Sequence, residues 1–400
     1  MSSHPVLQLK KNEARRLRAG HLWVFSNEVD TARTPLKAMT PGDLADVMDE
    51  NGKPVGTALV NPHSLICARL ISRRPGVNPT RGWLADRLRQ ALSLRERFYE
   101  RPYYRLVFGE ADGLPGVVLD RFGDVLVGQL NTAGMDTLRS LLEAALADVV
   151  RPTAILWRND SPVRELEGLK REIVPGPGQL PAESEVVEGS LRFRLDLMSA
   201  QKTGWYFDQQ ANRARVWPLL AECGRVLDLY SYHGAWGIGA AAQGAAEVHC
   251  VDSSAPAVAA IRANADRNGV DRIVRPVHAD AEKHMDQCLA DGERFDAVIV
   301  DPPAFAPRSR DVKPALKAYR RVNEKAIRLV RPGGLLVSCS CSAHVHEDRF
   351  ADILRQAGRH VDRDLQVLMR LEQGPDHPVH PAIAESRYLK GLVVRVLPSF

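Results

Sequence analysis

The chain has 400 residues, a formal net charge of +5 and six cysteines that are scattered without paired spacing. This length predicts two or three domains, and the cysteine pattern argues against a disulfide framework and against a metal site. No apolar stretch approaches the roughly 20 residues of a membrane helix and no apolar signal core is present, which predicts a cytoplasmic protein.

Residues 1–78 are predicted to form a small β-rich domain. Short apolar runs at 44–48, 55–60 and 65–71 are typical of strands, and Asn51-Gly52 supplies the pair of positive φ angles that a tight hairpin needs. A compact module of this size can fold as a unit.

Basic residues gather in the same segment. Residues 1–100 hold 16 Lys and Arg against 10 Asp and Glu. Lys10, Lys11, Arg15 and Arg16 form a tight cluster without offsetting acids, which is the pattern expected for contact with RNA phosphates. A solvated helix face is an equally good interpretation of this cluster.

Residues 79–180 are predicted to form a separate α+β domain. Apolar residues recur at helical spacing within 81–100 and 138–150, and strands at 117–119 and 125–130 flank a turn. No motif in this domain indicates chemistry.

Residues 181–400 alternate between strands and helices, which predicts an α/β, Rossmann-like domain with a parallel sheet covered on both faces. The last of these strands is expected to begin after Arg331-Pro-Gly-Gly334, which we interpret as a breaker. Strands are predicted at 226–230, 247–251, 297–300 and 335–338, and helices include 256–268 and 315–330.

The first of these strands runs into a glycine-containing turn and then a helix, an arrangement typical of a cofactor site. An acid follows the second strand, where it can accept ribose hydroxyls, and another follows the third. The candidate cofactor-binding residues are Asp228, Tyr230, Ser231, Tyr232, Gly234, Asp252, Ser253, Asp280 and Ala281.

Two alternatives bear on this site. NAD is the competing cofactor, because a loose NAD-type string begins at Gly237. A pyrophosphate-binding loop must lie at the strand-to-helix turn, whereas Gly237 lies where the helix should already have begun. The pattern therefore favours S-adenosylmethionine. Two of these residues can also be explained without a cofactor. Gly234 can serve close packing of the helix, and Asp280 can cap the helix that follows it.

The fourth strand ends in Asp301-Pro-Pro-Ala-Phe305, a rigid rim suited to orienting the edge of a base. Two thiols, Cys339 and Cys341, lie at the end of the fifth strand and can act as nucleophiles. Cys339 lies inside the strand, where free cysteines usually belong to the core, so Cys341 is the better candidate.

This ordered set of motifs resembles class I S-adenosylmethionine-dependent methyltransferases and, more narrowly, the RlmI-type 23S rRNA (cytosine-C5) methyltransferases. The resemblance covers nearly the whole chain and includes an N-terminal PUA domain, a central segment like Glu110–Gly116 and a loop like Gln201–Gln209. The chain departs from the family at His233 and Ala235, where Thr and Gly are expected, and at Ala304, where Lys is usual.

The resemblance implies methyl transfer to C5 of an unpaired or extruded cytosine in large-subunit rRNA. Cys341 would add to C6, and Asp301 would hold the N3/N4 edge of the base. Lys202 and Phe305 are further candidates for RNA contact, although Phe305 can equally cap the sheet. The group that removes the C5 proton is not identified, and a homodimer is suggested.

Two other functions remain open. Asp-Pro-Pro rims also orient exocyclic amines of bases for direct methylation, which needs no thiol. A non-catalytic RNA-binding factor for ribosome assembly is the second alternative, because a fold does not guarantee an activity.

Overall fold

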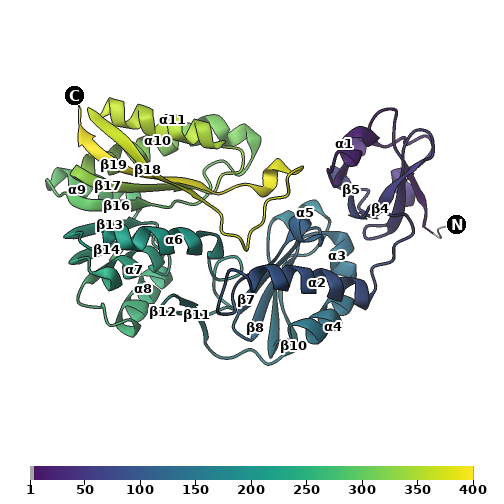
Figure 1. Cartoon of the computed structure of the whole chain (residues 1–400), viewed down its shortest axis with the longest axis horizontal. Helices are drawn as coiled ribbons and strands as arrows, with labels where there is room; N and C mark the ends of the chain where they lie inside the picture. The colour runs from purple at the N-terminus through teal and green to yellow at the C-terminus, as the bar shows by residue number, and fades with distance from the viewer. Residues whose placement is uncertain (1–3, 400) are drawn as a thin grey trace. The chain divides into compact units, whose positions relative to one another are not determined.

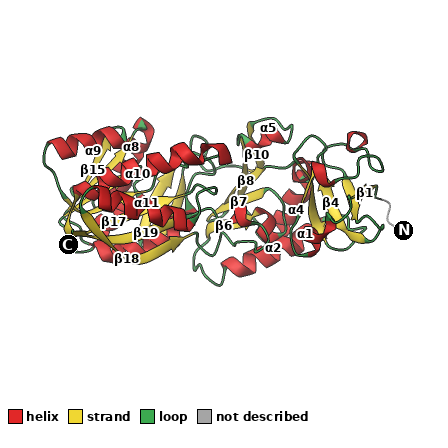
Figure 2. Ribbon diagram, turned by 90° about the horizontal axis from the view of Figure 1, so that it is seen from above, coloured by secondary structure: helices red, strands yellow, loops and turns green. Residues whose placement is uncertain are grey.

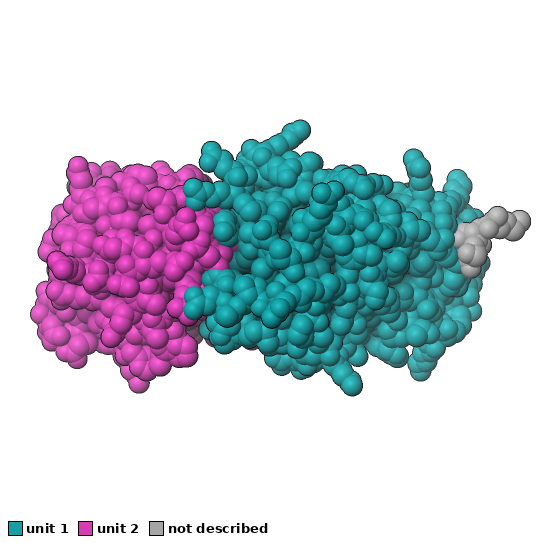
Figure 3. Space-filling model, turned by 90° about the horizontal axis from the view of Figure 1, so that it is seen from below, with its two compact units in different colours: residues 1–184, 196–205, 375–386 teal, residues 185–195, 206–374, 387–400 magenta. Residues whose placement is uncertain are grey.

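The computed structural model describes residues 4–399, which form two compact units (Figure 3). The first contains residues 4–184, Asp196–Trp205 and Pro375–Ser386, and the second contains Glu185–Leu195, Tyr206–Gly374 and residues 387–399. The two short segments 196–205 and 375–386 thus belong to the first unit, although the sequence places them in the third predicted domain. Among residues 4–399, no helix is long and apolar enough to cross a bilayer.

The N-terminal part of the first unit is a sheet with strand order β1-β3-β4-β5-β2 (Figure 1). The predicted hairpin at Asn51-Gly52 joins β3 to β4, but Gly52 alone of the two has a positive φ, at 76°, so the expected pair of left-handed residues is wrong. The elements are β1 (Val6–Gln8), α1 (Ala14–Arg18), β2 (Trp23–Phe25), β3 (Leu44–Met48), β4 (Pro54–Val60) and β5 (Ile66–Ser72).

The rest of the first unit is built on a second sheet with strand order β10-β9-β8-β7-β6. Leu59 and Ile71 from the N-terminal sheet pack into its hydrophobic core, so the two sheets share buried surface. The elements are α2 (Arg81–Arg95), β6 (Tyr103–Phe108), β7 (Val117–Phe122), β8 (Val125–Leu130), α3 (Ala133–Thr137), α4 (Arg139–Val149), β9 (Ala154–Asn159), α5 (Val163–Leu166) and β10 (Glu172–Gly178).

The turn at Glu110–Gly116 has a structural explanation. Asp112 accepts two hydrogen bonds from the fully buried Arg95, at 2.6 and 2.8 Å. Glu110 accepts from Trp23 Nε1 and from Arg69, at 2.7 and 2.8 Å, and so connects this turn to the N-terminal sheet. Both carboxylates are therefore engaged in holding the first unit together.

The second unit contains a sheet with strand order β15-β14-β13-β16-β17-β19-β18. The strands from β15 to β17 are parallel, and the direction in which the chain adds strands reverses beside β13, which is the switch point where such sheets bind ligands. The strands are β13 (Arg225–Leu229), β14 (Glu247–Asp252), β15 (Val274–His278), β16 (Phe295–Val300), β17 (Val330–Ser340), β18 (Arg363–Glu372) and β19 (Lys390–Pro398).

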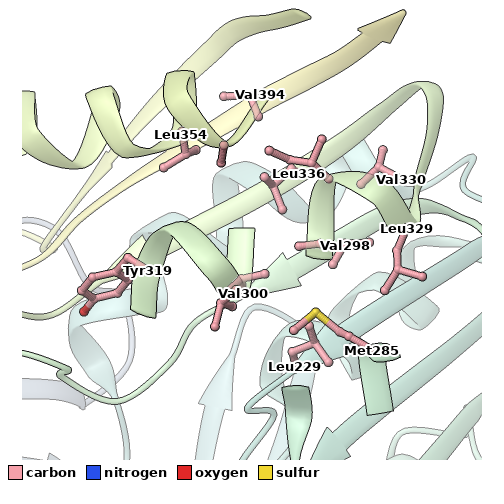
Figure 4. Packing of buried hydrophobic residues seen from close by; sticks show 14 of the residues in the cluster. Leu229, Met285, Val298, Val300, Tyr319, Leu329, Val330, Leu336, Leu354 and Val394 are labelled. Atoms are coloured by element: carbon pink, nitrogen blue, oxygen red, sulfur yellow. The ribbon is translucent and has the colours of Figure 1, made fainter. Parts of the chain in front are cut away.

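Helices cover both faces of this sheet, and α10 and α11 pack together over β17 and β19 (Figure 2). The core beneath them is mainly aliphatic, and the Tyr319 hydroxyl is directed away from the labelled aliphatic side chains (Figure 4). The helices are α6 (Gln210–Val216), α7 (Ala235–Gln243), α8 (Ala255–Arg267), α9 (Ala281–Ala290), α10 (Val312–Leu329) and α11 (Glu347–His360), and a small ladder pairs β11 (Ser184–Glu188) with β12 (Leu191–Leu195).

Two expectations for this sheet are corrected. The sheet is mixed, because β19 runs antiparallel to both β17 and β18. The segment Arg331–Gly334 does not precede the fifth strand but lies inside β17, where an irregular register and Gly333 with φ of 86° accommodate it. A bulge, which tolerates proline and glycine, replaces the expected breaker.

Candidate active site

The turn after β13 has an unusual main-chain conformation. Tyr230, Tyr232 and Gly234 have φ angles of 63°, 51° and 81°, all in the left-handed region. The Ser231 hydroxyl donates to the Asp228 carbonyl at 2.7 Å and helps to close the turn. Tyrosine in this region is strained, and such strain is found at sites where the backbone approaches a ligand.

Gly237 and Gly239 lie inside α7, as expected from their distance past the strand. A Cβ on Gly237 would lie 2.3 Å from Cys250 Sγ, and one on Gly239 would lie 2.0 Å from Trp217. These glycines therefore serve close packing of the helix, and the NAD-type string does not form a phosphate loop.

Asp228 is fully buried at the end of β13. Its Oδ2 accepts a hydrogen bond from the Gly237 amide at 3.0 Å, whereas within residues 4–399 its Oδ1 has no hydrogen-bond partner. Burial raises the pKa of this carboxyl to about 7. An open buried carboxylate oxygen fits the ammonium group at the methionine end of S-adenosylmethionine.

Asp252 connects the turns that follow β13 and β14. Its Oδ2 accepts from the Tyr232 amide and its Oδ1 from the Ser254 amide, both at 2.9 Å. Ser253 is exposed between them, and its carbonyl lies 3.0 Å from His278 Nε2. The predicted contact of Asp252 with ribose hydroxyls stays a prediction.

Asp280 follows β15 and caps α9, since its side chain accepts from the Lys283 amide at 3.0 Å. Ala281 is the first residue of that helix and is buried. The Ala279 amide donates to the Asp252 carbonyl at 3.1 Å, which places the ends of β14 and β15 side by side. The helix-cap interpretation of Asp280 is thus correct, and its contact with adenine remains a prediction.

His233, one of the departures from the family pattern, is buried against an aromatic neighbour. Its ring stacks on Tyr232 with centroids 3.9 Å apart, and Tyr206 meets Tyr232 edge-on at 5.3 Å. Burial lowers the pKa of His233 to about 4, so the imidazole is neutral at physiological pH.

Asp301 follows β16 and is held by two donors that the sequence did not single out. Gln209 Nε2 lies 3.0 and 3.1 Å from the two carboxylate oxygens, and Trp236 Nε1 lies 3.0 Å from Oδ2. Burial raises the pKa of Asp301 to about 6, although both hydrogen bonds oppose this change. Gln209 and Trp236 lie in or beside motifs used for prediction, but no local pattern pairs them with an acid 92 and 65 residues away.

The two thiols at the end of β17 have different environments. Cys339 is 1% exposed inside the strand, and burial raises its pKa well above the usual value. Cys341 lies just beyond the strand, is partly exposed, and has its Sγ 3.9 Å from the Pro302 carbonyl oxygen. A reactive thiol must be accessible, so these positions favour Cys341 as the nucleophile.

A hydroxyl network surrounds Cys341. The Tyr319 hydroxyl lies 2.9 Å from both Ser340 Oγ and Ser342 Oγ, and the Ala306 amide donates to Ser342 Oγ at 3.1 Å. This network joins the Cys341 turn to the loop that begins at Asp301. Phe305 packs on Tyr319 with centroids 4.7 Å apart, as a residue that caps the core would.

The predicted RNA-binding cations are not equivalent. Arg16 is ion-paired with Glu28 at 2.7 Å, so the expectation of a cluster without offsetting acids is wrong for this residue. Lys10, Lys11 and Arg15 are exposed. Lys202 is also exposed, in the segment 196–205 of the first unit.

Comparisons with known proteins identify the families to which two parts of the chain are similar. A family model of PUA-like domains matches residues 7–73, and one of S-adenosylmethionine-dependent methyltransferases matches residues 177–395. A relative from Klebsiella pneumoniae (strain 342), named ribosomal RNA large subunit methyltransferase I, is 35% identical and covers 99% of each chain.

Solved structures support the same fold. A methyltransferase from Streptococcus mutans superposes with a TM-score of 0.82 at 19% identity, covering 98% of this chain and 100% of the other. A second methyltransferase structure, complexed with S-adenosylhomocysteine, gives a TM-score of 0.83 at 19% identity, with the same coverage.

Proposed function

The chain belongs to the S-adenosylmethionine-dependent methyltransferase family that includes the ribosomal RNA large subunit methyltransferase I proteins, and from this premise we propose that it methylates C5 of a cytosine in large-subunit ribosomal RNA. The observation that carries the proposal is the partly exposed Cys341 thiol, 3.9 Å from the carbonyl of Pro302 in the loop that starts at Asp301. A methyltransferase that acts on an amine has no need of a thiol there.

Cytosine C5 is a weak nucleophile, and a thiolate overcomes this by adding to the ring. The Cys341 sulfur forms a bond to C6, and the electron pair of the C5–C6 double bond moves into the ring, which makes C5 an enamine-like carbon. After methylation, a base removes the proton from C5, the S–C6 bond breaks and the electron pair returns to sulfur. The enzyme thiolate is thereby regenerated.

Asp301 is suited to the N3 side of the base. Its pKa of about 6 lies close to physiological pH, so the carboxyl can hold or release a proton there. A protonated Asp301 can donate to N3 while the thiolate adds to C6. Gln209 and Trp236 keep the carboxyl in place.

S-adenosylmethionine, when bound, supplies the electrophilic methyl group on a sulfonium. Asp228 would hold its ammonium through the open Oδ1, and the turn at 230–234 would lie against the ligand. Asp252, Ser253, Asp280 and Ala281 surround the neighbouring strand ends, where an adenosine would lie in this fold.

The RNA would be held by the N-terminal cations and by Lys202. Lys10, Lys11 and Arg15 provide an exposed basic surface on the PUA-like domain. The target cytosine must leave any stack before a thiol can reach C6, which favours an unpaired or extruded base.

The decisive experiment compares Cys341→Ser with Cys339→Ala, using labelled S-adenosylmethionine and large-subunit ribosomal RNA that lacks the modification. We expect Cys341→Ser to lose at least about 10³-fold in methyl transfer, because nothing then adds to C6, and to retain S-adenosylhomocysteine binding. Cys339→Ala should stay within about tenfold of the unmodified protein. Nucleoside mass spectrometry should identify 5-methylcytosine.

Other results point to the alternatives. Full activity of Cys341→Ser, with a methylated exocyclic amine as product, would replace C5 transfer by direct amine methylation. If no labelled methyl group is transferred to any form of RNA or ribosomal subunit, the protein is a non-catalytic RNA-binding factor.

A further inference from the structure

Lys390 is a buried cation beside the proposed nucleophile. It is the first residue of β19, and it pairs with Ser340 of β17, the residue immediately before Cys341. The side chain is almost inaccessible, since the residue is 7% exposed. Lysine is rarely buried in proteins unless its charge is compensated.

Both hydrogen bonds that the structure gives the Lys390 ammonium go to the turn that carries Cys341. Its Nζ donates to the carbonyl oxygens of Ser342 and Val345, at 2.5 and 2.8 Å. Within residues 4–399, no carboxylate lies within ion-pair distance of this ammonium. Two carbonyl dipoles compensate a buried charge incompletely, and an anion next to the ammonium would complete the arrangement.

We propose that the Lys390 ammonium is the counter-ion of the Cys341 thiolate and makes this cysteine a nucleophile at neutral pH. Lys390 acts as a positioning residue, because it touches the turn and not the base. The inference rests on the proposed role of Cys341 in methyl transfer, but it concerns the free enzyme and can be tested without RNA.

Other charged groups near the pair do not replace Lys390. Arg387 and Glu347 also interact electrostatically with Lys390, and the Glu347 carboxylate is bound by Arg370 and Arg387. Burial lowers the pKa of Lys390 to about 8, and its interaction with Cys341 opposes that change. The titratable groups that interact with Cys341 or lie beside those that do are Cys339, Tyr206, Tyr319, Asp208 and Asp301.

The charges of these groups show in which direction the pKa of Cys341 should move when Lys390 loses its charge. An ionised Asp301 disfavours a thiolate, and the two tyrosines are neutral because burial raises their pKa values. Lys390 is the cation that donates into the turn, and opposite charges favour each other's charged forms. Loss of its charge should therefore raise the pKa of Cys341.

The ion pair fits the covalent cycle. The Cys341 thiol loses its proton to water, and the ammonium, which transfers no proton, stabilises the resulting thiolate. The thiolate electron pair forms the bond to C6, and when that bond breaks the pair returns to sulfur beside the same ammonium. Lys390 thus stabilises both the attacking and the departing sulfur.

The test measures the rate of iodoacetamide alkylation of Cys341 against pH in the full-length protein, with peptide mass spectrometry to separate Cys341 from Cys339. Lys390→Gln keeps hydrogen-bond donors for the two carbonyls but removes the charge. We expect its alkylation midpoint to move up by about one pH unit or more, and its rate at pH 7 to fall by about tenfold. Lys390→Arg should keep the midpoint within about half a unit.

The exposed Lys317 on α10 supplies the control, since Lys317→Gln removes a lysine charge from the surface and should leave the midpoint unchanged. An unchanged midpoint in a folded Lys390→Gln protein would reduce Lys390 to a structural anchor and overturn the proposal. If that variant does not fold, the unmodified protein decides: a midpoint below the usual thiol value of about 8.5 supports the ion pair, and one at or above this value overturns it.

This result is independent of the methylation assay. The thiolate pairing can fail while Cys341→Ser still abolishes 5-methylcytosine formation, in which case the proposed function stands. Conversely, the alkylation midpoint of Cys341 can shift in Lys390→Gln although the protein transfers no methyl group to RNA. In that case the ion pair is supported and the proposed methylation of cytosine C5 is wrong.

Discussion

Two turns at the same edge of the sheet position the chemistry by different means. The turn after β13 is shaped by its main chain, with Tyr230, Tyr232 and Gly234 in the left-handed region. The turn after β17 is instead held by side chains, namely the hydroxyl of Tyr319 and the ammonium of Lys390. The main chain therefore shapes the candidate cofactor site, whereas single side chains of distant elements hold the candidate nucleophile.

The strongest test of this difference changes the charge beside the first turn without changing its shape. Asp228→Asn keeps an acceptor for the Gly237 amide. Because the pKa of Asp228 in the folded protein is about 7, above its ordinary value, ionisation destabilises the fold progressively from about pH 4 to pH 7. The Asn variant should therefore be more stable than the unmodified protein by on the order of 3 kcal/mol at pH 8 and nearly equal to it at pH 4.

The same variant should bind S-adenosylhomocysteine at least about tenfold more weakly, because the ammonium loses its carboxylate partner. Denaturant unfolding at several pH values and calorimetric titration measure the two effects. Equal stability of the two proteins across this pH range would show that burial does not raise the pKa of Asp228.

A smaller effect is expected from Gly234→Ala, which adds a side chain where φ is 81°. The new Cβ would lie 3.0 Å from Ile238 Cδ1. Strain and contact together should cost about 1 to 2 kcal/mol of stability and weaken cofactor binding. Thermal unfolding and binding titration provide the measurement.

Gly269→Ala is the matched control for this change. Gly269 has φ of 69°, and an added Cβ would meet nothing within 4 Å, so this variant tests the cost of conformation alone. It should lose about 1 kcal/mol and keep its cofactor affinity. Equal cofactor affinity of both variants would contradict a main-chain role for the first turn.

The smallest effect should come from Tyr319→Phe, which removes one hydroxyl from the second turn. Two hydrogen bonds to Ser340 and Ser342 are lost, and we expect a cost of about 1 kcal/mol in stability. The methyl-transfer rate should fall severalfold while the KM for S-adenosylmethionine is unchanged, because the cofactor turn is untouched. A changed KM for S-adenosylmethionine with an unchanged methyl-transfer rate would contradict this expectation, because it would mean that Tyr319 acts on the cofactor turn.

Local patterns predicted a large part of the fold. The strands β13, β14 and β16 and the helix α8 lie within one or two residues of their expected bounds, and the glycines of the NAD-type string lie inside α7. These segments are long, buried and periodic. The predictions failed where pairing overrides local preference: β17 passes through Arg331–Gly334, and Asn51 does not adopt a positive φ.

The site could be predicted in part. Asp228, Asp252, Asp301 and Cys341 lie at the ends of strands that are evident from their apolar runs. The groups that hold Asp301 and the Cys341 turn were missed because they reach their partners from far along the chain, as Lys390 does from 48 residues beyond Ser342. A local pattern has no information on such pairs.

The sequence alone determined which segments along the chain form strands and which residues follow them, since burial and alternation are encoded within each segment. It favoured Cys341 over Cys339 as the exposed thiol, but it could not show which groups surround either one. The tertiary structure separates them: Gly391 of β19 lies against Cys339, with an added Cβ 2.9 Å from its sulfur, whereas Cys341 emerges past the strand end. Burial and charge at a thiol depend on which distant element packs there, and this is a property of the folded chain.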